Sequence, residues 1–302
     1  NTFTYTLQSN TSANNYDISV EKGKLTIAAT ADEVVVTIKE NSGTETYDGT
    51  EKTVTGYAVQ SISSKLYTEK DFTFRGKAEV KGTNAGIYDM ELTPADFRNT
   101  NQNFTKVTFV IVDGKLTIEK RKVTLTSASA SKDYDGTPLT AKNVTVSGDG
   151  FANGEGATYN VTGSQTEKGT SKNTFTYELK SNTKASNYTI EVGYGDLTVT
   201  SEDGEVVVVI IGRKDTFEYT GTEKSVKGYD VSITEGSTYS ESDFTFSGND
   251  EVKGTEAGTY DMGLKPEDFT NNNENYGKVT FQVLDGQLKI TPKSIIPDGP
   301  DT

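Results

Sequence analysis

The side chains that could do chemistry in this chain are carboxylates, lysines, asparagines and tyrosines, because its 302 residues include no His and no Cys. Without His the commonest general base and the commonest metal ligand are both missing. Without Cys there is no thiolate nucleophile and no disulfide framework. No Gly-x-Ser-x-Gly nucleophile elbow occurs either. We therefore expect no enzyme activity, no catalytic residues and no resident cofactor.

Two polar loops carry the hard oxygen ligands that Ca²⁺ prefers. The first combines Gly148-Asp149-Gly150 with Asn153-Gly154-Glu155, and the second is Asn271–Asn275. Neither has the spacing of an EF-hand. Ordinary polar turns are the prediction, so no metal site is assigned, and Ca²⁺ is the alternative.

Lysines and asparagines recur at matching positions and could in principle form intramolecular isopeptide bonds, which would replace disulfides. The recurring pairs are Lys52/Lys224, Lys81/Lys253, Lys106/Lys278, Asn99/Asn271, Asn101/Asn273 and Asn103/Asn275. The reaction requires a buried Lys with a lowered pKa, and most of these residues sit beside turns.

Tyrosines are the remaining candidates, since exposed aromatic rings are the usual platform for a carbohydrate ring. The chain has 16 Tyr and no Trp. Tyr57/Tyr229 and Tyr67/Tyr239 recur without an obvious structural task. Packing in the core or at its edge is the prediction, and glycan stacking is the alternative.

The net charge of the chain limits the kinds of molecule that it can bind. Asp and Glu number 44 against 30 Lys and Arg, which gives a formal charge of −14. Such a chain repels phosphate backbones and anionic lipid, so we expect neither nucleic acid nor membrane insertion. Abundant Thr, Val, Tyr and Phe favour strands.

The elements that hold these side chains repeat along the sequence. Residues 33–118 recur as 205–290 without a gap and with more than half of the positions identical, and residues 1–27 recur as 173–199. A fixed period indicates an array of modules. Four segments close on Gly-x-Leu-x-Ile/Val, beginning at Gly23, Gly114, Gly195 and Gly286. In each, the Gly predicts a tight turn and the alternating apolar residues predict an inward strand face.

Turn residues punctuate each module. Asp113-Gly114 and Asp285-Gly286 separate alternating hydrophobic runs and predict hairpins. Tyr47-Asp48-Gly49-Thr50, Tyr134-Asp135-Gly136-Thr137 and Tyr219-Thr220-Gly221-Thr222 predict turns with positive φ at Gly. Tyr88, Tyr260, Tyr16 and Tyr188 each start a strand after a turn, as a tyrosine corner does. Only single helical turns are expected, at Pro94–Phe97 and Pro266–Phe269.

We therefore predict an all-β fold, a tandem array of small immunoglobulin-like β-sandwich modules that forms an elongated, monomeric rod. β-Grasp-like modules are the alternative, although they need a helix. The predicted segments are the C-terminal part of a short module (1–30), a first long module (31–119), a short module (120–201), a second long module (202–292) and a linker or tail (293–302). Because residues 1–30 hold only part of a module, we expect the chain to be a piece of a longer one.

The Tyr-Asp-Gly-Thr turn, the Ala-Gly-x-Tyr element at 85–88 and 257–260 and the Gly-x-Leu-x-Ile ending together resemble the YDG and MBG repeat domains of large bacterial surface proteins. The short module resembles the YDG type and the long modules the MBG type. Thr220 departs from the pattern, which places the side-chain cap of that turn in question. The resemblance implies secreted, cell-wall or cell-surface adhesins without catalytic residues.

The function expected on this basis is a repeat region that projects a binding domain from a bacterial cell, with weak multivalent contacts to host or matrix glycans or proteins. Modules that bind glycan or protein in their own right are one alternative. A carbohydrate-binding appendage of a secreted enzyme is the other.

Overall fold

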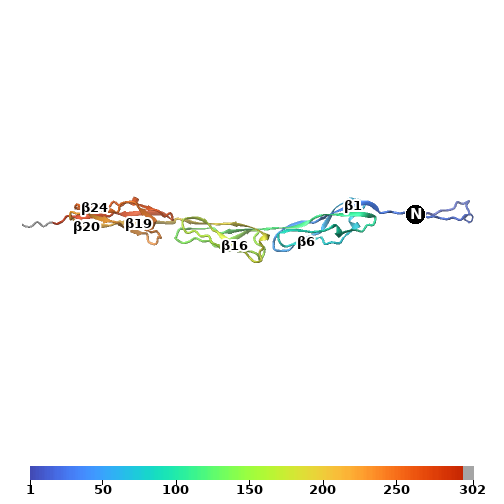
Figure 1. Cartoon of the computed structure of the whole chain (residues 1–302), viewed down its shortest axis with the longest axis horizontal. Helices are drawn as coiled ribbons and strands as arrows, with labels where there is room; N and C mark the ends of the chain where they lie inside the picture. Colours follow the sequence, from blue (N-terminus) through green and yellow to red (C-terminus); the bar gives the residue numbers. More distant parts are fainter. Residues whose placement is uncertain (295–302) are drawn as a thin grey trace, which may run out of the picture. The chain divides into compact units, whose positions relative to one another are not determined.

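Strands and short 3-10 turns make up the regular structure of residues 1–294, which are the residues that the computed structural model describes. Each sheet draws its strands from a single stretch of chain: 30–119, 121–200 or 202–291. Figure 1 shows β1 and β6 in the first stretch, β16 in the second, and β19, β20 and β24 in the third. The all-β, tandem-module prediction is confirmed. No helix of the described residues exceeds three residues, so the β-grasp alternative is wrong.

The strand bounds follow the predicted apolar runs. The first long module contains β1 (Thr30–Glu40), β2 (Gly43–Thr46), β3 (Lys52–Thr55), β4 (Tyr57–Ile62), β5 (Phe72–Phe74), β6 (Glu79–Gly82), β7 (Gly86–Asp89), β8 (Phe97–Asn99), β9 (Phe104–Val112) and β10 (Lys115–Glu119). The short module contains β11 (Arg121–Ser127), β12 (Ala130–Asp133), β13 (Val144–Gly148), β14 (Ala157–Val161), β15 (Gly169–Lys172), β16 (Phe175–Leu179), β17 (Tyr188–Gly193) and β18 (Asp196–Thr200). The second long module contains β19 (Glu202–Gly212), β20 (Lys214–Glu218), β21 (Lys224–Lys227), β22 (Tyr229–Ile233), β23 (Phe244–Phe246), β24 (Glu251–Gly254), β25 (Gly258–Asp261), β26 (Phe269–Asn271), β27 (Tyr276–Leu284) and β28 (Gln287–Thr291).

Residues 1–294 contain six 3-10 turns, of which the first precedes all strands and the other five connect strands. They are η1 (Ala13–Asn15), η2 (Glu69–Asp71), η3 (Pro94–Asp96), η4 (Ala185–Asn187), η5 (Glu241–Asp243) and η6 (Pro266–Asp268). The turns at Pro94 and Pro266 confirm the predicted single turns, and Pro suits their first position because its missing N–H would have no partner there.

In each long module, both main sheets contain a central strand with one parallel and one antiparallel neighbour. In the first module β1 pairs in parallel with β9 and antiparallel with β4. In the second sheet β10 pairs in parallel with β2 and antiparallel with β7. Two chain segments, β1–β2 and β9–β10, therefore run side by side and pass together from one sheet to the other.

The predicted hairpins at Asp113-Gly114 and Asp285-Gly286 are wrong for this reason. β9 and β10 lie in different sheets and do not pair with each other, and the same is true of β27 and β28. The Asp-Gly pair marks a kink at which a strand changes sheet.

The Gly that begins each Gly-x-Leu-x-Ile/Val segment lets two backbone segments come close together at that kink. A Cβ on Gly114 would lie 2.3 Å from the carbonyl oxygen of Asn41, and one on Gly195 would lie 2.6 Å from that of Ser127. No real Cβ fits at such distances. The Leu and Ile that follow face inward as predicted, since Leu116 and Leu288 are fully buried.

Residues 1–29 depart from the prediction, because they form no strand and contain only η1 (Figure 1). Leu25 is 77% exposed and Ile27 is 94% exposed, whereas their counterparts Leu197 and Val199 are buried. The counterparts are buried because β18 pairs with β12 and β15. Residues 1–29 contain no strands that could pair in the same way with the segment around Leu25 and Ile27.

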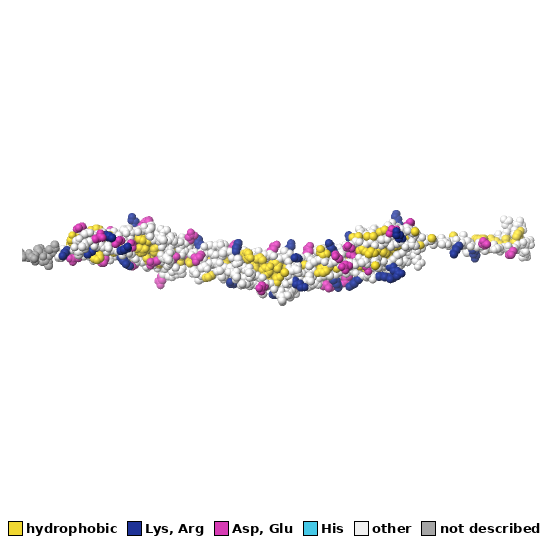
Figure 2. Space-filling view, in the orientation of Figure 1, with side chains coloured by type: hydrophobic (Ala, Val, Ile, Leu, Met, Phe, Trp, Pro, Cys, Tyr) yellow, Lys and Arg dark blue, Asp and Glu magenta, His cyan; other side chains and the backbone are white. Residues whose placement is uncertain are grey.

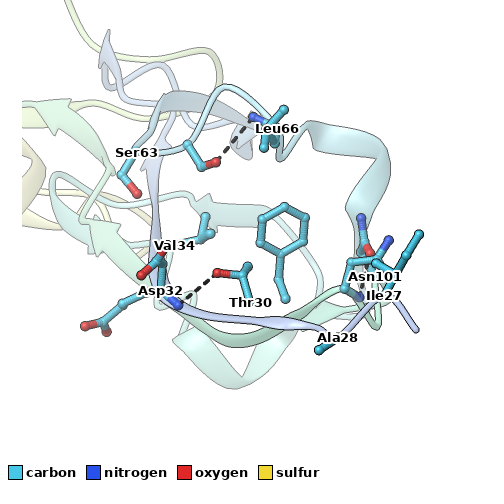
Figure 3. A pocket seen from close by; sticks show the side chains of 12 residues that line it. Ile27, Ala28, Thr30, Asp32, Val34, Ser63, Leu66 and Asn101 are labelled. Atoms are coloured by element: carbon cyan, nitrogen blue, oxygen red, sulfur yellow. Dashed lines mark hydrogen bonds between the residues drawn. The ribbon is translucent and has the colours of Figure 1, made fainter. Parts of the chain in front are cut away.

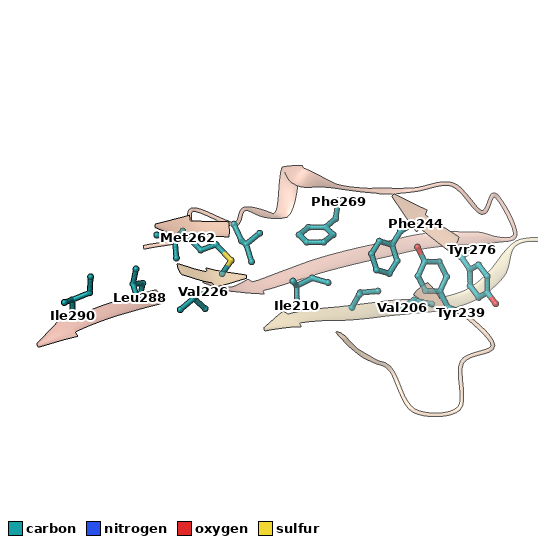
Figure 4. Packing of buried hydrophobic residues seen from close by; sticks show 13 residues of the cluster. Val206, Ile210, Val226, Tyr239, Phe244, Met262, Phe269, Tyr276, Leu288 and Ile290 are labelled. Atoms are coloured by element: carbon teal, nitrogen blue, oxygen red, sulfur yellow. The ribbon is translucent and has the colours of Figure 1, made fainter. Parts of the chain in front are cut away.

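An apolar core fills the second long module along its length, and Figure 4 shows its ends. Val206, Tyr239, Phe244 and Tyr276 gather at one end, and Met262, Leu288 and Ile290 at the other. The aromatic rings meet mostly edge to face, as between Tyr239 and Tyr276 at 4.9 Å. Such pairs add to the stabilisation that area burial gives.

The predicted Gly-Thr turns are confirmed in all three modules, and the tyrosine corners are confirmed in the two long modules. Gly49, Gly136 and Gly221 all have positive φ, between 73° and 85°. The Tyr88 hydroxyl donates to the carbonyl of Asn84 at 2.9 Å, and the Tyr260 hydroxyl to that of Glu256 at 3.0 Å.

The other two corner tyrosines do not have this role. Tyr16 is 62% exposed, and the hydroxyl of the buried Tyr188 bonds elsewhere, as described below. That corner prediction is wrong for both residues.

Contacts divide the chain into two compact units. One comprises residues 1–122 together with Phe151–Glu155 and Lys184–Thr189, and the other comprises the remaining residues. Two loops of the short module thus pack with the first long module. The predicted linker 293–302 lies almost wholly outside the described residues.

The surface is charged and mixed. Figure 2 shows acidic and basic side chains interspersed over the visible face. Interspersed charge suits a solvated module surface. None of the helical turns in residues 1–294 is long and apolar enough to cross a membrane.

Candidate functional site: the contacts of Tyr47 and Tyr134

Three tyrosines, Tyr47, Tyr134 and Tyr219, start the Gly-Thr turns and occupy equivalent places. The backbone N–H of each donates to the carbonyl at the end of its module's last strand. The acceptors are Glu119 at 2.9 Å, Thr200 at 2.9 Å and Thr291 at 2.8 Å. The ring of each therefore stands where its module ends, and we call this position the turn tyrosine.

Tyr47 is docked against the short-module loops that belong to the first compact unit. Only 5% of Tyr47 is exposed, and its ring meets the ring of Tyr188 edge-on at 5.5 Å. Its hydroxyl donates to Oε1 of Glu155 at 2.5 Å. Burial, followed by the hydrogen bond to Glu155, raises the pKa of Tyr47.

One carboxylate holds both phenols at this contact. The Tyr188 hydroxyl donates to Oε2 of Glu155 at 2.7 Å and accepts the N–H of Ala152 at 3.0 Å. Burial raises the pKa of Tyr188. Hydrogen bonds to an ionised group are stronger than neutral ones, so Glu155 ties the contact together.

Asn187 supplies a second, separate attachment. Its side chain is fully buried, and its Oδ1 accepts the N–H of Ala85 at 2.9 Å while its Nδ2 donates to Oδ1 of Asn84 at 3.1 Å. Ala85 directly precedes β7. A buried side-chain amide with both atoms paired fixes the position of the loop that carries it.

The same contact recurs in the second compact unit, around Tyr134. Its ring meets that of Tyr276 at 5.6 Å and 75°. Oδ1 of Asn275 accepts the N–H of Lys168 at 2.6 Å, and its Nδ2 donates to Glu167. Burial is the first cause of the raised pKa of Tyr134, and Glu167 is the second.

The two contacts follow one rule of position. Ala85 and Lys168 each directly precede the Gly that begins β7 or β15. Asn187 and Asn275 each directly precede the Tyr that begins β17 or β27. We call the turn tyrosine together with the backbone N–H of Ala85 or Lys168 the socket. We call the Asn and the aromatic residue that follows it the tip. The sockets at Tyr47 and Tyr134 each hold the tip of the module that follows in sequence.

The tip is not among the predicted site residues, although the sequence carries a signal for it. Asn stands directly before an aromatic residue at 15–16, 103–104, 187–188 and 275–276, once in each module. Glu155, the other residue of the first contact, has no repeated counterpart in the sequence that would have drawn attention to it.

The tyrosines considered for glycan stacking pack in the core (Tyr67, Tyr239) or at its edge (Tyr57, Tyr229), as predicted. Tyr67 and Tyr239 are 2% and 4% exposed, and burial raises the pKa of each to about 12. The Tyr57 ring packs edge-on against Phe74 at 4.9 Å and Phe97 at 5.1 Å. Tyr229 repeats those contacts with Phe246 and Phe269.

The two candidate calcium loops are engaged in these contacts instead. Glu155 of the first loop binds two phenols, and Asn275 of the second binds Lys168 and Glu167. Residues 1–294 contain no group of three or more His, Cys, Asp or Glu side chains placed to hold a metal ion. Occupancy by Ca²⁺ itself stays untested.

Five of the six lysines considered for isopeptide bonds have carboxylate partners, and the sixth, Lys224, lies over the Phe217 ring. Lys52 bonds to Asp48 at 2.5 Å, Lys106 to Glu33 at 3.0 Å and Lys278 to Glu205 at 2.8 Å. Asn99 and Asn101 bond instead to Tyr67 and Asp71. Within the described residues this arrangement places none of these lysines against a candidate Asn.

A depression in the first long module offers no reactive set of side chains (Figure 3). Asp32 and Glu33 are the only titratable residues that line it, and Glu33 is paired with Lys106 and Thr108. Asn103 and Phe104 also line it. They are the tip of this module, with no turn tyrosine against it among residues 1–294.

Comparison with known proteins identifies the long modules. The sequence profile described as "MBG domain" matches residues 34–120 and 205–292, which is more than half of the chain. The chain belongs to the MBG domain family. The resemblance of the short module to the YDG type stays a prediction, because the profile does not extend to it.

Two further comparisons add little to the MBG assignment. No curated protein matches the chain. Among solved structures, one match is the "Crystal structure of Dscam1 isoform 9.44, N-terminal four Ig domains", at 9% identity and a TM-score of 0.19. The match covers 85% of this chain and 73% of that one. Tandem MBG domains are, at the level of the family, the arrangement of an adhesin-type repeat region.

Proposed function

We propose that this chain is part of the repeat region of a bacterial surface adhesin, where it holds a binding domain away from the cell surface or cell wall. The observation that carries the proposal is the recurrence of one docking contact, at Tyr47 and again at Tyr134. Almost no linker separates the MBG domains from the short module, because β10 ends at Glu119 and β11 begins at Arg121. Docked modules with short connections have little hinge freedom.

The chemistry of the side chains agrees with a spacer. Tyr57, Tyr67, Tyr229 and Tyr239, which could have formed a glycan platform, pack in the core or at its edge. Lys52, Lys106 and Lys278 are paired with carboxylates. The mixed surface charge favours solubility over any single partner. Weak multivalent contacts with host or matrix ligands would require surfaces other than these rings.

Small-angle scattering of the whole chain tests the spacer role. A compact chain of this length would have a radius of gyration of about 19 Å. A spacer should give a value well above that, with a largest dimension of about 100 Å or more, since modules of this size measure roughly 30–40 Å along their strands. A radius near 19 Å contradicts the proposal.

Distance measurements test the docking contacts directly. The chain has no Cys, so dyes can be attached through Leu66→Cys and Leu284→Cys, which replace side chains 81% and 58% exposed. We expect a narrow distance distribution that broadens when Tyr47 and Tyr134 are both changed to Ala. Tyr219→Ala is the matched control and should leave the distribution unchanged. An equally broad distribution in the unaltered chain contradicts a semi-rigid spacer.

A further inference from the structure

Two exposed arginines of the first long module have no charge partner. In the part of the chain that the structure describes, neither Arg75 nor Arg98 makes a side-chain hydrogen bond or an ion pair. The other two arginines are engaged, since Arg213 pairs with Asp230 at 3.0 Å and Arg121 donates to a backbone carbonyl. Carboxylates are plentiful in a chain of net charge −14. The two unpaired guanidiniums are therefore available to a ligand.

Strand pairing brings these two arginines onto one face of the module. β5 pairs with β8 so that Thr73 faces Arg98, and the ladder continues with the N–H of Arg75 bonded to the carbonyl of Asp96 at 2.8 Å. Residues two apart on a strand point to the same side of a sheet. Arg75 and Arg98 are therefore diagonal neighbours, whose Cβ atoms lie within about 8 Å of each other. Two long side chains at that separation can reach one bound group.

A depression of about 660 Å³ is lined by both arginines and by no Asp or Glu. Small-molecule sites span roughly 300–1,000 Å³. The loop after β8 also lines it, and Asn99 holds that loop in shape by donating to the carbonyls of Asn101 at 3.2 Å and Phe104 at 2.9 Å. Thr100 and Gln102 of the loop are exposed, and their side chains have no hydrogen-bond partner among the described residues. They add a free hydroxyl and a free amide to the two guanidiniums.

Docking of a neighbouring module leaves this place uncovered. The second long module shows the docked state, because its tip is held at Tyr134. Ser247 and Thr270 stand there at the positions of the two arginines, and Glu274 stands at that of Gln102. All three are exposed. The exposure of the two arginines is therefore a property of the module itself.

We propose that this depression binds a carboxylated sugar of a glycan, with Arg75 and Arg98 on the carboxylate and Thr100 and Gln102 on ring hydroxyls. A guanidinium presents a planar pair of N–H groups that matches a carboxylate. The amide and the hydroxyl both donate and accept hydrogen bonds, as sugar hydroxyls do. The acidic chain as a whole repels a long polyanion, whereas one carboxylate meets only the local positive charge. Such binding goes beyond the spacer role and would hold whether or not the modules are docked.

NMR of the arginine Nε–Hε groups in the whole chain tests the proposal, because the sequence has only four arginines. The probes are the methyl glycosides of glucuronic acid and of N-acetylneuraminic acid, added to about 20 mM at low ionic strength, because an exposed site of this kind should have a Kd on the order of 10⁻³ M. We expect at least one probe to shift the Arg75 and Arg98 signals in a saturable way and to leave those of Arg121 and Arg213 in place. Methyl glucoside, which has the ring without the carboxylate, should shift none of them.

The second long module supplies the matched variants. Arg75→Ser and Arg98→Thr introduce the residues that stand at the same positions there, so the fold should persist. Each should weaken binding about tenfold, read from the signal of the remaining arginine, because one charged hydrogen-bond donor is lost. Arg213→Asn is the control, since Asn41 stands at the matching position of the first module, and it should leave the binding unchanged.

Three results would overturn the proposed acidic-sugar site. The Arg75 and Arg98 signals could stay in place throughout both titrations, which would mean that no carboxylated sugar binds. All four arginine signals could shift alike, which would indicate a general effect of added charge. Acetate or inorganic phosphate could shift the two signals as strongly as the glycosides at equal concentration, and the sugar ring would then contribute nothing.

Discussion

The two long modules fold the same strands from closely related sequences, yet they satisfy one buried turn with different side chains. In the first module Glu40 ends β1 and is only 2% exposed. Its Oε1 accepts the N–H of Leu92 and its Oε2 that of Gly114, each at 2.6 Å. One carboxylate thus serves two buried backbone donors next to the kink between the sheets.

The second module has Gly212 in place of Glu40. There Asp285 turns inward, and its carboxylate accepts the N–H groups of Gly263 at 3.0 Å and Leu264 at 2.9 Å. A Cβ at Gly212 would lie 2.2 Å from the backbone nitrogen of Gly286, so this kink has no room for a side chain. The comparison teaches that the matching N–H groups of Leu92 and Leu264 both receive a carboxylate, and that the residue which supplies it differs between the modules.

The largest effect should come from Glu40→Ala, which leaves the Leu92 and Gly114 N–H groups buried without partners. Bonds to a charged group contribute roughly 1.5–3 kcal/mol each, so we expect a loss of about 3 kcal/mol or more. Hydrogen exchange of the whole chain can read each module separately. Protection should fall in residues 31–119 and stay unchanged in 202–292.

Asp285→Ala makes the converse change and should lower protection only in the second long module. Its bonds are more exposed, so the loss should be smaller. Equal protection of the first module in Glu40→Ala and in the unaltered chain would mean that water replaces the carboxylate, and the comparison above would fail.

The second largest effect should come from the docking contact, which is present at Tyr47 in the first long module and absent at Tyr219 within residues 1–294. Tyr47→Phe removes the hydrogen bond to Glu155 but keeps the ring, and we expect a loss of about 1–2 kcal/mol. Exchange should accelerate in loops 151–155 and 184–189. Tyr219→Phe should change nothing, because no docked module lies against the Tyr219 hydroxyl within residues 1–294. A similar loss in both variants would show that the hydroxyl acts within its own module.

The Gly-Thr turns differ in their caps. Asp48 accepts the N–H of Thr50 at 2.9 Å and binds Lys52, and these bonds hold the pKa of Asp48 well below its usual range. Thr220 lacks this cap, since its hydroxyl bonds only that of Thr222. Thr220→Asp should therefore stabilise the second module by about 1 kcal/mol, and Asp48→Thr should destabilise the first by a similar amount.

The effect of Asp48→Thr should depend on pH. Because folding lowers the pKa of Asp48, its contribution is complete above the unfolded value of about 4 and is lost as the pH falls below it. The difference between the variant and the unaltered chain should shrink as the pH is lowered from 6 to 2. A difference that grows in acid would reverse this assignment.

The smallest effect should come from Glu91→Gly. Glu91 is the only non-Gly residue of 1–294 with positive φ, at 63°, and its counterpart in the second module is Gly263 at 84°. A left-handed backbone costs a side chain about 1 kcal/mol, so Glu91→Gly should leave the first module unchanged or stabilise it by about 0.5 kcal/mol. Gly263→Ala should destabilise the second. Thermal unfolding followed by hydrogen exchange checks both.

Much of the fold could be predicted from local patterns, because they report local geometry. Alternation of apolar residues on either side of Asp113-Gly114 and Asp285-Gly286 located β9, β10, β27 and β28, and the Ala-Gly-x-Tyr element located the corner tyrosines Tyr88 and Tyr260. The Asp-Gly pair at 113–114 predicts a hairpin but forms a kink, because the same dipeptide suits both a tight turn and a kink. Which of the two forms depends on whether the flanking strands find partners far away in sequence, and β9 finds β1.

The amino-acid sequence determined the repeat, the strand-forming segments and the absence of thiol and imidazole chemistry, since these follow from residue types and their spacing. Tertiary structure alone decided what Tyr188 and Glu155 contact, and which backbone donors Glu40 and Asp285 satisfy. Those partners lie tens of residues apart, and a side chain selects among them by distance and burial, which exist only once the strands have packed. A Tyr that resembled a corner residue therefore became part of a docking contact.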